Sequence, residues 1–310
     1  MSKALVVIKS MGIGDLVILI ANIHAISKSL QKPVTVLAQN NTKASDILKY
    51  DPHIEEVISL DKKGLINIIK KIKPKNFDHS YIYSDSLRLY LISKFSGINK
   101  KFQYNFFSKK GKNFFKTAKE FTEKVLEINI NHYSKIFWDE NEIKKTKEKF
   151  NISNKTKNIV CGISASGPTK RWDIKNYVRL FENINKKHPS KFFIAAGPKD
   201  EDLVNEIMNS PIKKNCIFFT KMSIAETIPI ISACQYYVGN DTGWGQISAA
   251  LNLKSLFLFC DSPTSYGLWR KNISIIVPEG ETVESCGHNT RGKDKILFSK
   301  VLTKALELIN

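Results

Sequence analysis

The sequence predicts an α/β protein with two Rossmann-like domains facing a cleft. Short, continuous apolar runs alternate with longer helical patterns, which is typical of parallel strands covered by helices. A polar segment without apolar periodicity, residues 151–158, interrupts this alternation near the middle of the chain. The 310 residues also suit two cores better than one. We therefore expect domains at residues 1–152 and 158–310.

The composition is that of a globular protein, with 42% apolar and 25% charged residues. A formal charge of +19 is compatible with nucleic-acid binding, but only five of the 48 basic residues are arginines. Arginine supplies most bidentate contacts to phosphates and bases. The composition therefore favours a solvated lysine surface with no nucleic-acid partner, and secondarily attraction to an anionic membrane face.

The five cysteines are far apart and mostly within apolar runs, which indicates buried free thiols and no metal site. No apolar run approaches the roughly 20 residues of a membrane span. The first apolar run is cut by Lys9 and lacks a small-residue cleavage site, which excludes a signal peptide. A cytoplasmic protein is expected.

The first domain opens with a buried strand over residues 4–8, a Gly12-Ile13-Gly14-Asp15 turn and a helix over 16–30. A G-x-G at this place can begin a dinucleotide-binding fingerprint, but its third glycine is replaced by Val17. The residues therefore argue against a nicotinamide dehydrogenase. Asp15 can cap the helix or act as a base.

The alternation continues through the first half. We expect the following: strands 34–38, 55–60 and 79–84; helices 42–49, 64–72, 121–130 and 140–150; an irregular segment 99–118.

Two loops of the second domain combine features of anion binding. The strand 159–164 precedes the loop 165–172, which contains small hydroxyl residues, a glycine and Lys170. The strand 236–238 precedes Gly239-Asn240-Asp241-Thr242-Gly243 and a helical pattern. A helix start after a tight turn presents backbone N–H groups to an anion. Asp241 is expected to cap this helix or to hold a nearby cation, while Thr242 and Gly243 offer N–H groups.

The other elements of the second half are expected as follows: strands 192–196, 216–219 and 255–259; a helix from residue 200; a capping box over 223–226; a polar, glycine-rich surface segment over 278–294; a closing helix over 298–309 that packs on its own domain or back on the first.

Several motifs together resemble glycosyltransferase family 9, the bacterial heptosyltransferases that extend the lipopolysaccharide inner core. They are Gly14-Asp15, Lys170-Arg171-Trp172, Met222 in Lys-Met-Ser, and Asp241-Thr242-Gly243. The family usually has a histidine three residues after the last glycine, where this chain has Gln246. The resemblance covers nearly the whole chain and implies the GT-B arrangement.

The resemblance also implies an inverting, metal-independent transfer of a heptose-like sugar, with no cofactor. The donor would be a nucleotide sugar, ADP-linked, and the acceptor a lipid-linked saccharide of the lipopolysaccharide core. Asp15 would be the catalytic base, with Gly14 and Arg88 on the acceptor side. The donor-binding residues would be Ser166, Thr169, Lys170, Met222, Asp241, Thr242, Gly243 and Gln246, with Asp200 or Glu201 as candidates for the ribose hydroxyls.

Two other classes of protein remain possible from the sequence. A sugar-nucleotide epimerase of the same architecture would share the phosphate loops. A non-catalytic basic protein would use the lysine surface to bind a nucleic acid or a membrane, with an affinity that falls steeply as salt rises.

Overall fold

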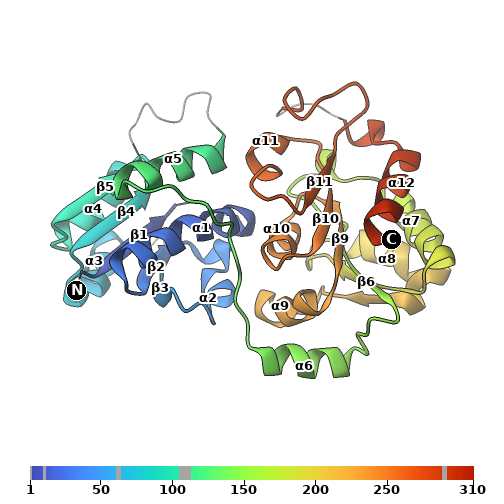
Figure 1. Cartoon of the computed structure of the whole chain (residues 1–310), viewed down its shortest axis with the longest axis horizontal. Helices are drawn as coiled ribbons and strands as arrows, with labels where there is room; N and C mark the ends of the chain where they lie inside the picture. The colour runs from blue at the N-terminus through green and yellow to red at the C-terminus, as the bar shows by residue number, and fades with distance from the viewer. Residues whose placement is uncertain (1, 10–11, 61–63, 105–112, 288–291) are drawn as a thin grey trace. The chain divides into compact units, whose positions relative to one another are not determined.

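A computed structural model describes residues 2–9, 12–60, 64–104, 113–287 and 292–310 (Figure 1). The chain forms two compact units, residues 1–137 and 138–310, each built on one parallel sheet. This confirms the predicted α/β class with two Rossmann-like domains. The division falls between Phe137 and Trp138, whereas the sequence indicated a linker at 151–158.

The first unit contains a five-stranded sheet in the order β3-β2-β1-β4-β5. Its elements are β1 (Ala4–Ile8), α1 (Ile13–Leu30), β2 (Val34–Ala38), α2 (Ala44–Ile47), β3 (Ile54–Ser59), α3 (Leu65–Ile72), β4 (His79–Tyr83), α4 (Leu87–Phe95), β5 (Lys100–Gln103) and α5 (Phe114–Leu126).

Successive side chains of β1 serve the two faces of this sheet. Leu5 and Val7 belong to the core that also holds the buried side chains of α3 and α4. Val6 is fully buried as well and alternates with them, so it belongs to the opposite face. Burial on both faces explains why the strand is apolar throughout.

The second unit contains a six-stranded sheet in the order β11-β10-β9-β6-β7-β8. Its elements are α6 (Glu140–Lys149), β6 (Lys157–Gly162), α7 (Ile174–Lys187), β7 (Ser190–Ala195), α8 (Glu201–Met208), β8 (Cys216–Phe218), α9 (Ile224–Ala233), β9 (Tyr236–Asn240), α10 (Gly243–Ala250), β10 (Lys254–Leu258), α11 (Pro263–Tyr266), β11 (Ile273–Ile276) and α12 (Phe298–Ile309). Figure 1 shows α7, α8 and α12 on one side of this sheet and α9, α10 and α11 on the other.

The helices at both ends of the second unit pack within that unit. Helix α6 packs against α9 and so belongs to this unit. Helix α12 buries Val301, Ala305 and Ile309 in the core under the second sheet. The capping box at Ser223 and Glu226 is confirmed, since Glu226 Oε2 accepts from Ser223 N at 2.7 Å and Ser223 Oγ accepts from Glu226 N at 3.3 Å.

Part of the segment predicted to be irregular is ordered. Residues 100–103 form the edge strand β5, paired with β4, and α5 begins at Phe114, seven residues before the expected start. The sequence also missed β11, which pairs with β10. Residues 105–112 of this segment, and 288–291 of the expected polar segment 278–294, lie outside the described residues.

Among the described helices, α1 alone is long and apolar enough to cross a membrane by length and composition. This differs from the expectation that no run approaches that length. However, 67% of the helix is buried inside the protein, and its residues 16–27 are all buried. Such burial is what a core helix of a globular domain shows.

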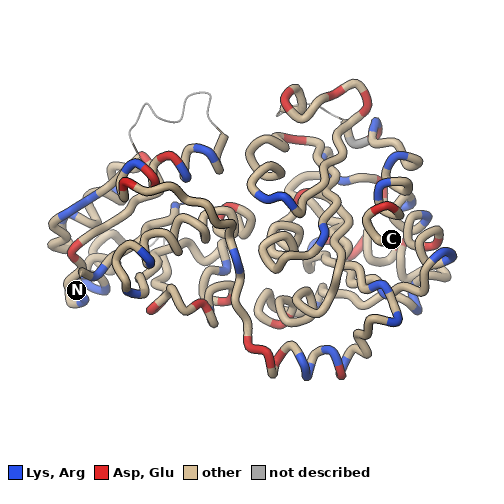
Figure 2. Tube along the Cα trace, in the orientation of Figure 1, with Lys and Arg blue, Asp and Glu red and all other residues tan. Residues whose placement is uncertain are grey.

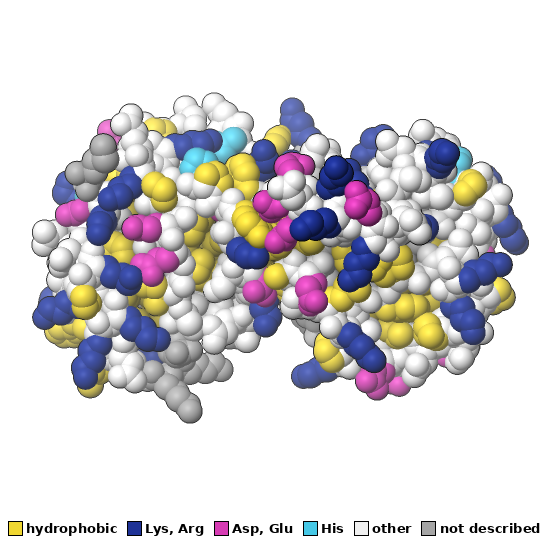
Figure 3. All heavy atoms as spheres, turned by 90° about the horizontal axis from the view of Figure 1, so that it is seen from below, with side chains coloured by type: hydrophobic (Ala, Val, Ile, Leu, Met, Phe, Trp, Pro, Cys, Tyr) yellow, Lys and Arg dark blue, Asp and Glu magenta, His cyan; other side chains and the backbone are white. Residues whose placement is uncertain are grey.

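Basic side chains are spread over both units with acidic side chains between them (Figures 2 and 3). Helix α6, for example, carries both glutamates and lysines. Basic and acidic side chains thus share the surface, whereas the composition favoured a surface of solvated lysines.

Candidate functional site

The second sheet has its topological switch point between β6 and β9. The chain proceeds outward from β6 to β7 and β8, and from β9 to β10 and β11 in the other direction. The β6 loop (residues 163–173) and the β9 loop (residues 241–243) therefore leave neighbouring strand ends on the same edge of the sheet. Ligands of open α/β sheets bind at such a point.

The two strands approach each other closely because both carry a glycine there. Gly162 and Gly239 are paired directly across β6 and β9. A Cβ atom on Gly239 would lie 2.5 Å from both the nitrogen and the oxygen of Gly162, which no side-chain rearrangement can relieve. The distance between the starts of the two loops is thus set by main-chain atoms, because neither glycine has a side chain.

Asn240 joins the two loops. It is fully buried, and its Oδ1 accepts from the backbone nitrogen of Trp172 at 3.1 Å. Its Nδ2 donates to the carbonyl oxygens of Ile163 and Ser164 at 3.0 and 3.3 Å. One buried amide therefore holds both ends of the β6 loop to the end of β9.

Thr242, not Asp241, caps α10. Its Oγ1 accepts from Gly245 N at 3.1 Å, so the predicted capping role of Asp241 was wrong. The first two residues of the helix, Gly243 and Trp244, keep backbone N–H groups that no helical carbonyl can satisfy. Gly243 has helical backbone, so its role does not depend on a positive φ.

Both cationic side chains of the β6 loop are paired with carboxylates. Lys170 forms an ion pair with Asp261, which follows β10 and is mostly buried. Arg171 forms an ion pair of 3.2 Å with Asp200, and Asp200 also accepts from Gly197 N at 2.8 Å. Asp200, which the sequence offered for ribose hydroxyls, thus holds Arg171.

Gln246 is buried and makes three hydrogen bonds. Its Nε2 donates to Asp241 Oδ1 at 2.7 Å and to the carbonyl oxygen of Tyr266 at 3.1 Å. Its Oε1 accepts from Trp269 Nε1 at 2.7 Å. Gln246 therefore connects the β9 loop to the end of α11 and to a buried tryptophan.

The other predicted donor-binding residues follow strands of the same sheet. Ser166 and Thr169 are exposed in the β6 loop, and Met222 is partly buried after β8. Because all strands are parallel, these residues belong to the same edge as the β9 loop. Sequence reasoning missed Asn240 and Asp261, whose partners lie far away along the chain.

In the first unit, the predicted acceptor-side residues gather at the other switch point. Strands β1 and β4 are neighbours, with Ile8 opposite Tyr83. Gly14 and Asp15 open α1 after β1, and Arg88 lies in the first turn of α4 after β4. Asp15 Oδ2 accepts from Gly12 N at 3.3 Å, so it is part of the helix start and is also partly exposed.

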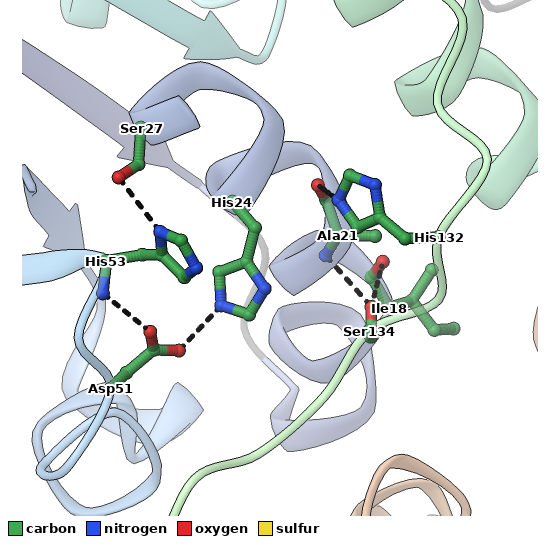
Figure 4. Close-up of polar contacts among 8 residues, drawn as sticks. All are labelled: Ile18, Ala21, His24, Ser27, Asp51, His53, His132 and Ser134. Atoms are coloured by element: carbon green, nitrogen blue, oxygen red, sulfur yellow. Dashed lines mark hydrogen bonds and ion pairs between the residues drawn. The ribbon is translucent and has the colours of Figure 1, made fainter. Parts of the chain in front are cut away.

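Sequence reasoning missed a histidine cluster in the first unit. His24 Nε2 and Asp51 Oδ2 lie 2.7 Å apart, both buried, and Asp51 Oδ1 accepts from His53 N at 3.0 Å (Figure 4). His53 Nδ1 lies 3.1 Å from Ser27 Oγ. This cluster fastens the turn before β3 to α1, and burial lowers the pKa of His53.

Within the described ranges, no group of three or more histidine, cysteine, aspartate or glutamate side chains could hold a metal ion. The cysteines carry no disulfide; four of them are buried.

The two units differ in the polar groups that they provide. For binding an anion, the second unit has two helix N–H groups and a loop lysine. The first unit offers a carboxylate at the start of α1.

Comparison with known proteins identifies the family and the fold. The sequence matches Glycosyltransferase family 9 (heptosyltransferase) over residues 66–295, more than half of the chain. It is 22% identical to lipopolysaccharide heptosyltransferase 1 of Campylobacter coli, with 91% of each chain covered.

Two solved structures share the fold. The ADP-heptose lipopolysaccharide heptosyltransferase II of E. coli superposes with a TM-score of 0.79 at 18% identity, covering 99% of this chain and 98% of the other. A family 9 glycosyltransferase of Veillonella parvula superposes with a TM-score of 0.81 at 17% identity, covering 99% and 97%.

Proposed function

Because the chain belongs to glycosyltransferase family 9, we propose that it transfers a heptose-like sugar from an ADP-linked donor to a saccharide of the lipopolysaccharide core. The family makes the chain a transferase. The relatives' names, a lipopolysaccharide heptosyltransferase and an ADP-heptose enzyme, support the choice of donor and acceptor.

One structural observation carries the donor side of this proposal. The β6 and β9 loops leave adjacent strand ends and are tied together by Asn240, so that Lys170 and the first N–H groups of α10 belong to one site. A lysine side chain together with backbone N–H donors in fixed positions is a suitable binding site for a diphosphate. Ser166, Thr169 and Met222 would contact the rest of the nucleotide.

In the proposed reaction, Asp15 accepts the proton of the acceptor hydroxyl as its oxygen attacks the anomeric carbon. The bond between the anomeric carbon and the diphosphate oxygen breaks, and the configuration inverts. The negative charge that develops on the leaving diphosphate is stabilised by Lys170 and by the N–H groups of Gly243 and Trp244. Gly14 and Arg88 would contact the acceptor.

We further propose that the reaction needs no metal ion or other cofactor, since the loop cation and helix N–H groups can supply the electrostatic stabilisation. The enzyme would act in the cytoplasm, where ADP-sugars are available, with peripheral contact to the anionic inner membrane face. The mixed-charge surface supports only weak, salt-sensitive membrane contact.

A two-step experiment tests the function. Thermal unfolding with ADP, UDP, GDP and NAD should show selective stabilisation by ADP. Mass spectrometry should then detect a heptosylated core oligosaccharide with ADP-heptose as donor, with undiminished yield in EDTA. Conversion of the nucleotide sugar without any acceptor would instead indicate an epimerase. Binding to anionic polymers without nucleotide preference would indicate a non-catalytic basic protein.

A further inference from the structure

The outer side of helix α4 is as apolar as its inner side. Leu89 and Ile92 belong to the core of the first unit. On the other side of the helix, Leu87 and Phe95 are 69% and 57% exposed, and Leu91 is partly exposed. These three residues follow one another at intervals of four, so they form one stripe along the solvent side. A helix that is apolar all round is normally covered on both sides, so the stripe indicates an apolar partner.

Helix α3 packs beside α4 and extends this surface. Ile68 and Ile72 of α3 belong to the same core as the buried residues of α4, so both helices cover the same face of the first sheet. Their outer sides therefore look away from the sheet in the same direction. Ile66, in the first turn of α3, is 67% exposed. We define the α3–α4 face by six residues on these outer sides: Ile66, Lys70, Leu87, Leu91, Lys94 and Phe95.

The elements around this face carry charge of one sign only. Helix α3, the turn Lys73–Lys75, α4 and β5 each contain two basic residues and no acidic one. Lys75 forms an ion pair of 2.6 Å with Glu56, and Lys101 donates to backbone carbonyls. The other six basic residues are all exposed: Lys70, Lys71, Lys73, Arg88, Lys94 and Lys100. Helix α6, in contrast, carries both signs. The α3–α4 face is therefore complementary to an anionic partner.

We propose that the α3–α4 face docks on an anionic lipid bilayer. The apolar stripe of α4 enters the boundary between headgroups and acyl chains, and the surrounding lysines contact lipid phosphates. Exposed leucine and phenylalanine side chains bordered by lysines are typical of segments that lie in a membrane interface. A nucleic acid would use the lysines but would leave Leu87 and Phe95 in water. The stripe therefore favours a membrane over a nucleic acid.

The α3–α4 face adjoins the proposed acceptor site. Strands β1 and β4 are parallel neighbours, so α1 and α4, which follow them, begin at the same edge of the sheet. Asp15 lies in the first turn of α1, and Leu87 begins α4. A bilayer on this face would present a lipid-linked saccharide close to the edge where Asp15 lies. The inference deepens the membrane contact proposed above, but binding to a bilayer requires no sugar transfer.

Flotation of the full-length protein with lipid vesicles tests the proposal. Wild type should bind vesicles of phosphatidylglycerol and phosphatidylethanolamine at least tenfold more tightly than vesicles of phosphatidylcholine alone. The double variant Leu87→Gln, Phe95→Gln removes most of the apolar stripe at two exposed positions. Its affinity for the anionic vesicles should fall about tenfold or more. Met208→Gln is the control, because Met208 is 43% exposed on α8 of the second unit, and it should bind like wild type.

A second pair of variants tests the lysines. Lys70→Glu with Lys94→Glu should weaken binding to the anionic vesicles about tenfold or more. Lys186→Glu with Lys214→Glu makes the same change in net charge at exposed positions of the second unit and should have a much smaller effect. All variants should keep the wild-type unfolding temperature, since the replaced side chains are exposed. The glutamine double variant should also keep its turnover of a deacylated, water-soluble acceptor.

Three results would overturn the proposal. The first is vesicle binding that is equal in wild type and in both α3–α4 face variants. The second is an equal loss of binding in these variants and in their second-unit controls. The third is retention on heparin or polyuridylic acid without binding to anionic vesicles, which would indicate a polyanion as the partner. Vesicle binding that depends on the α3–α4 face in a protein that transfers no heptose would contradict only the proposed function.

Discussion

Gln246 holds the carboxylate of Asp241 through a hydrogen bond of 2.7 Å from Nε2 to Oδ1. The same side chain hydrogen-bonds to Tyr266 O and Trp269 Nε1. At the position where the family usually has histidine, this chain therefore has a buried connector, and both polar atoms of its side chain form hydrogen bonds. Its amide therefore orients the β9 loop and not the sugar directly. Residue 246 would therefore affect which donor binds only indirectly, by setting the orientation of the Asp241 side chain.

We expect Gln246→Leu to lower the free energy of unfolding of the second unit by about 1–3 kcal/mol, since Trp269 Nε1 is left buried without a partner. The affinity for ADP should fall at the same time, because Asp241 is released. Urea unfolding and calorimetric ADP titration measure the two effects. Gln235→Leu is the control: it breaks a bond to Asn158 N at the opposite end of β9 and should leave ADP affinity unchanged. Equal ADP affinities in all three proteins would contradict the connector role.

The ion pair between Lys170 and Asp261 predicts two variants with opposite effects. Lys170→Ala should weaken ADP binding about tenfold or more, because a charge-assisted contact to the diphosphate is lost. Asp261→Asn should keep or strengthen ADP binding, since it frees Lys170 from a competing carboxylate. Lys175→Ala on α7 is the exposed-lysine control. If Asp261→Asn weakens ADP binding as much as Lys170→Ala does, Lys170 acts through the ion pair and not on the nucleotide.

Asp15→Asn separates catalysis from folding. Asparagine can still accept from Gly12 N, so the start of α1 should persist and the unfolding temperature should change little. Loss of the base should reduce kcat about 10²–10⁴-fold with nearly unchanged ADP affinity. Asp46→Asn, in the first turn of α2, is the matched control. A variant that melts early but keeps its turnover per folded molecule would make Asp15 a purely structural residue.

Three histidines make the stability of the first unit depend on pH. The pKa values of His53, His79 and His132 all lie below 6.5, chiefly because burial disfavours the charged ring. Nearby positive charges lower them further: Lys28 for His53 and His132, and Lys100 for His79. The unfolded chain therefore binds protons that the folded unit does not. The free energy of unfolding of the first unit should be at its full value above about pH 6.5 and should fall as the pH drops below it.

Urea unfolding of the first unit at pH 7.5 and 5.5 measures this dependence. His53→Gln should reduce the difference between the two pH values, whereas His188→Gln, in the second unit, should not affect it. A first-unit transition with the same midpoint at both pH values would show that these rings titrate alike in the folded and unfolded states.

The fold was predictable because parallel strands that are buried on both faces are apolar at every position. Strands β1, β2, β6 and β9 were all expected on this ground. Edge strand β5, Lys100–Gln103, was missed because its residues are mostly polar and either exposed or only partly buried. The strand therefore lacks an apolar run. The early start of α5 was missed because Asn113, its cap, lies in a stretch rich in Asn, Lys and Phe.

The site was predictable only as far as its local sequence allowed. Turns after strands and helix starts carry local signals, and these indicated the β6 and β9 loops. Asn240 contacts Trp172 across 68 residues, and Lys170 contacts Asp261 across a still longer stretch. Such pairings depend on the order of strands in the sheet. The capping residue of α10 was misassigned because Asp241 and Thr242 are adjacent and both suit the role.

The contact between Gly162 and Gly239 has a consequence for engineering. Because main-chain atoms alone fix how far apart the β6 and β9 loops begin, the distance between the starts of these loops is independent of the loop side chains. Residues such as Ser166, Thr169 and Met222 can then be randomised together in a library without moving the loop origins. Donor preference in this scaffold is therefore open to directed evolution, provided that both glycines are kept constant.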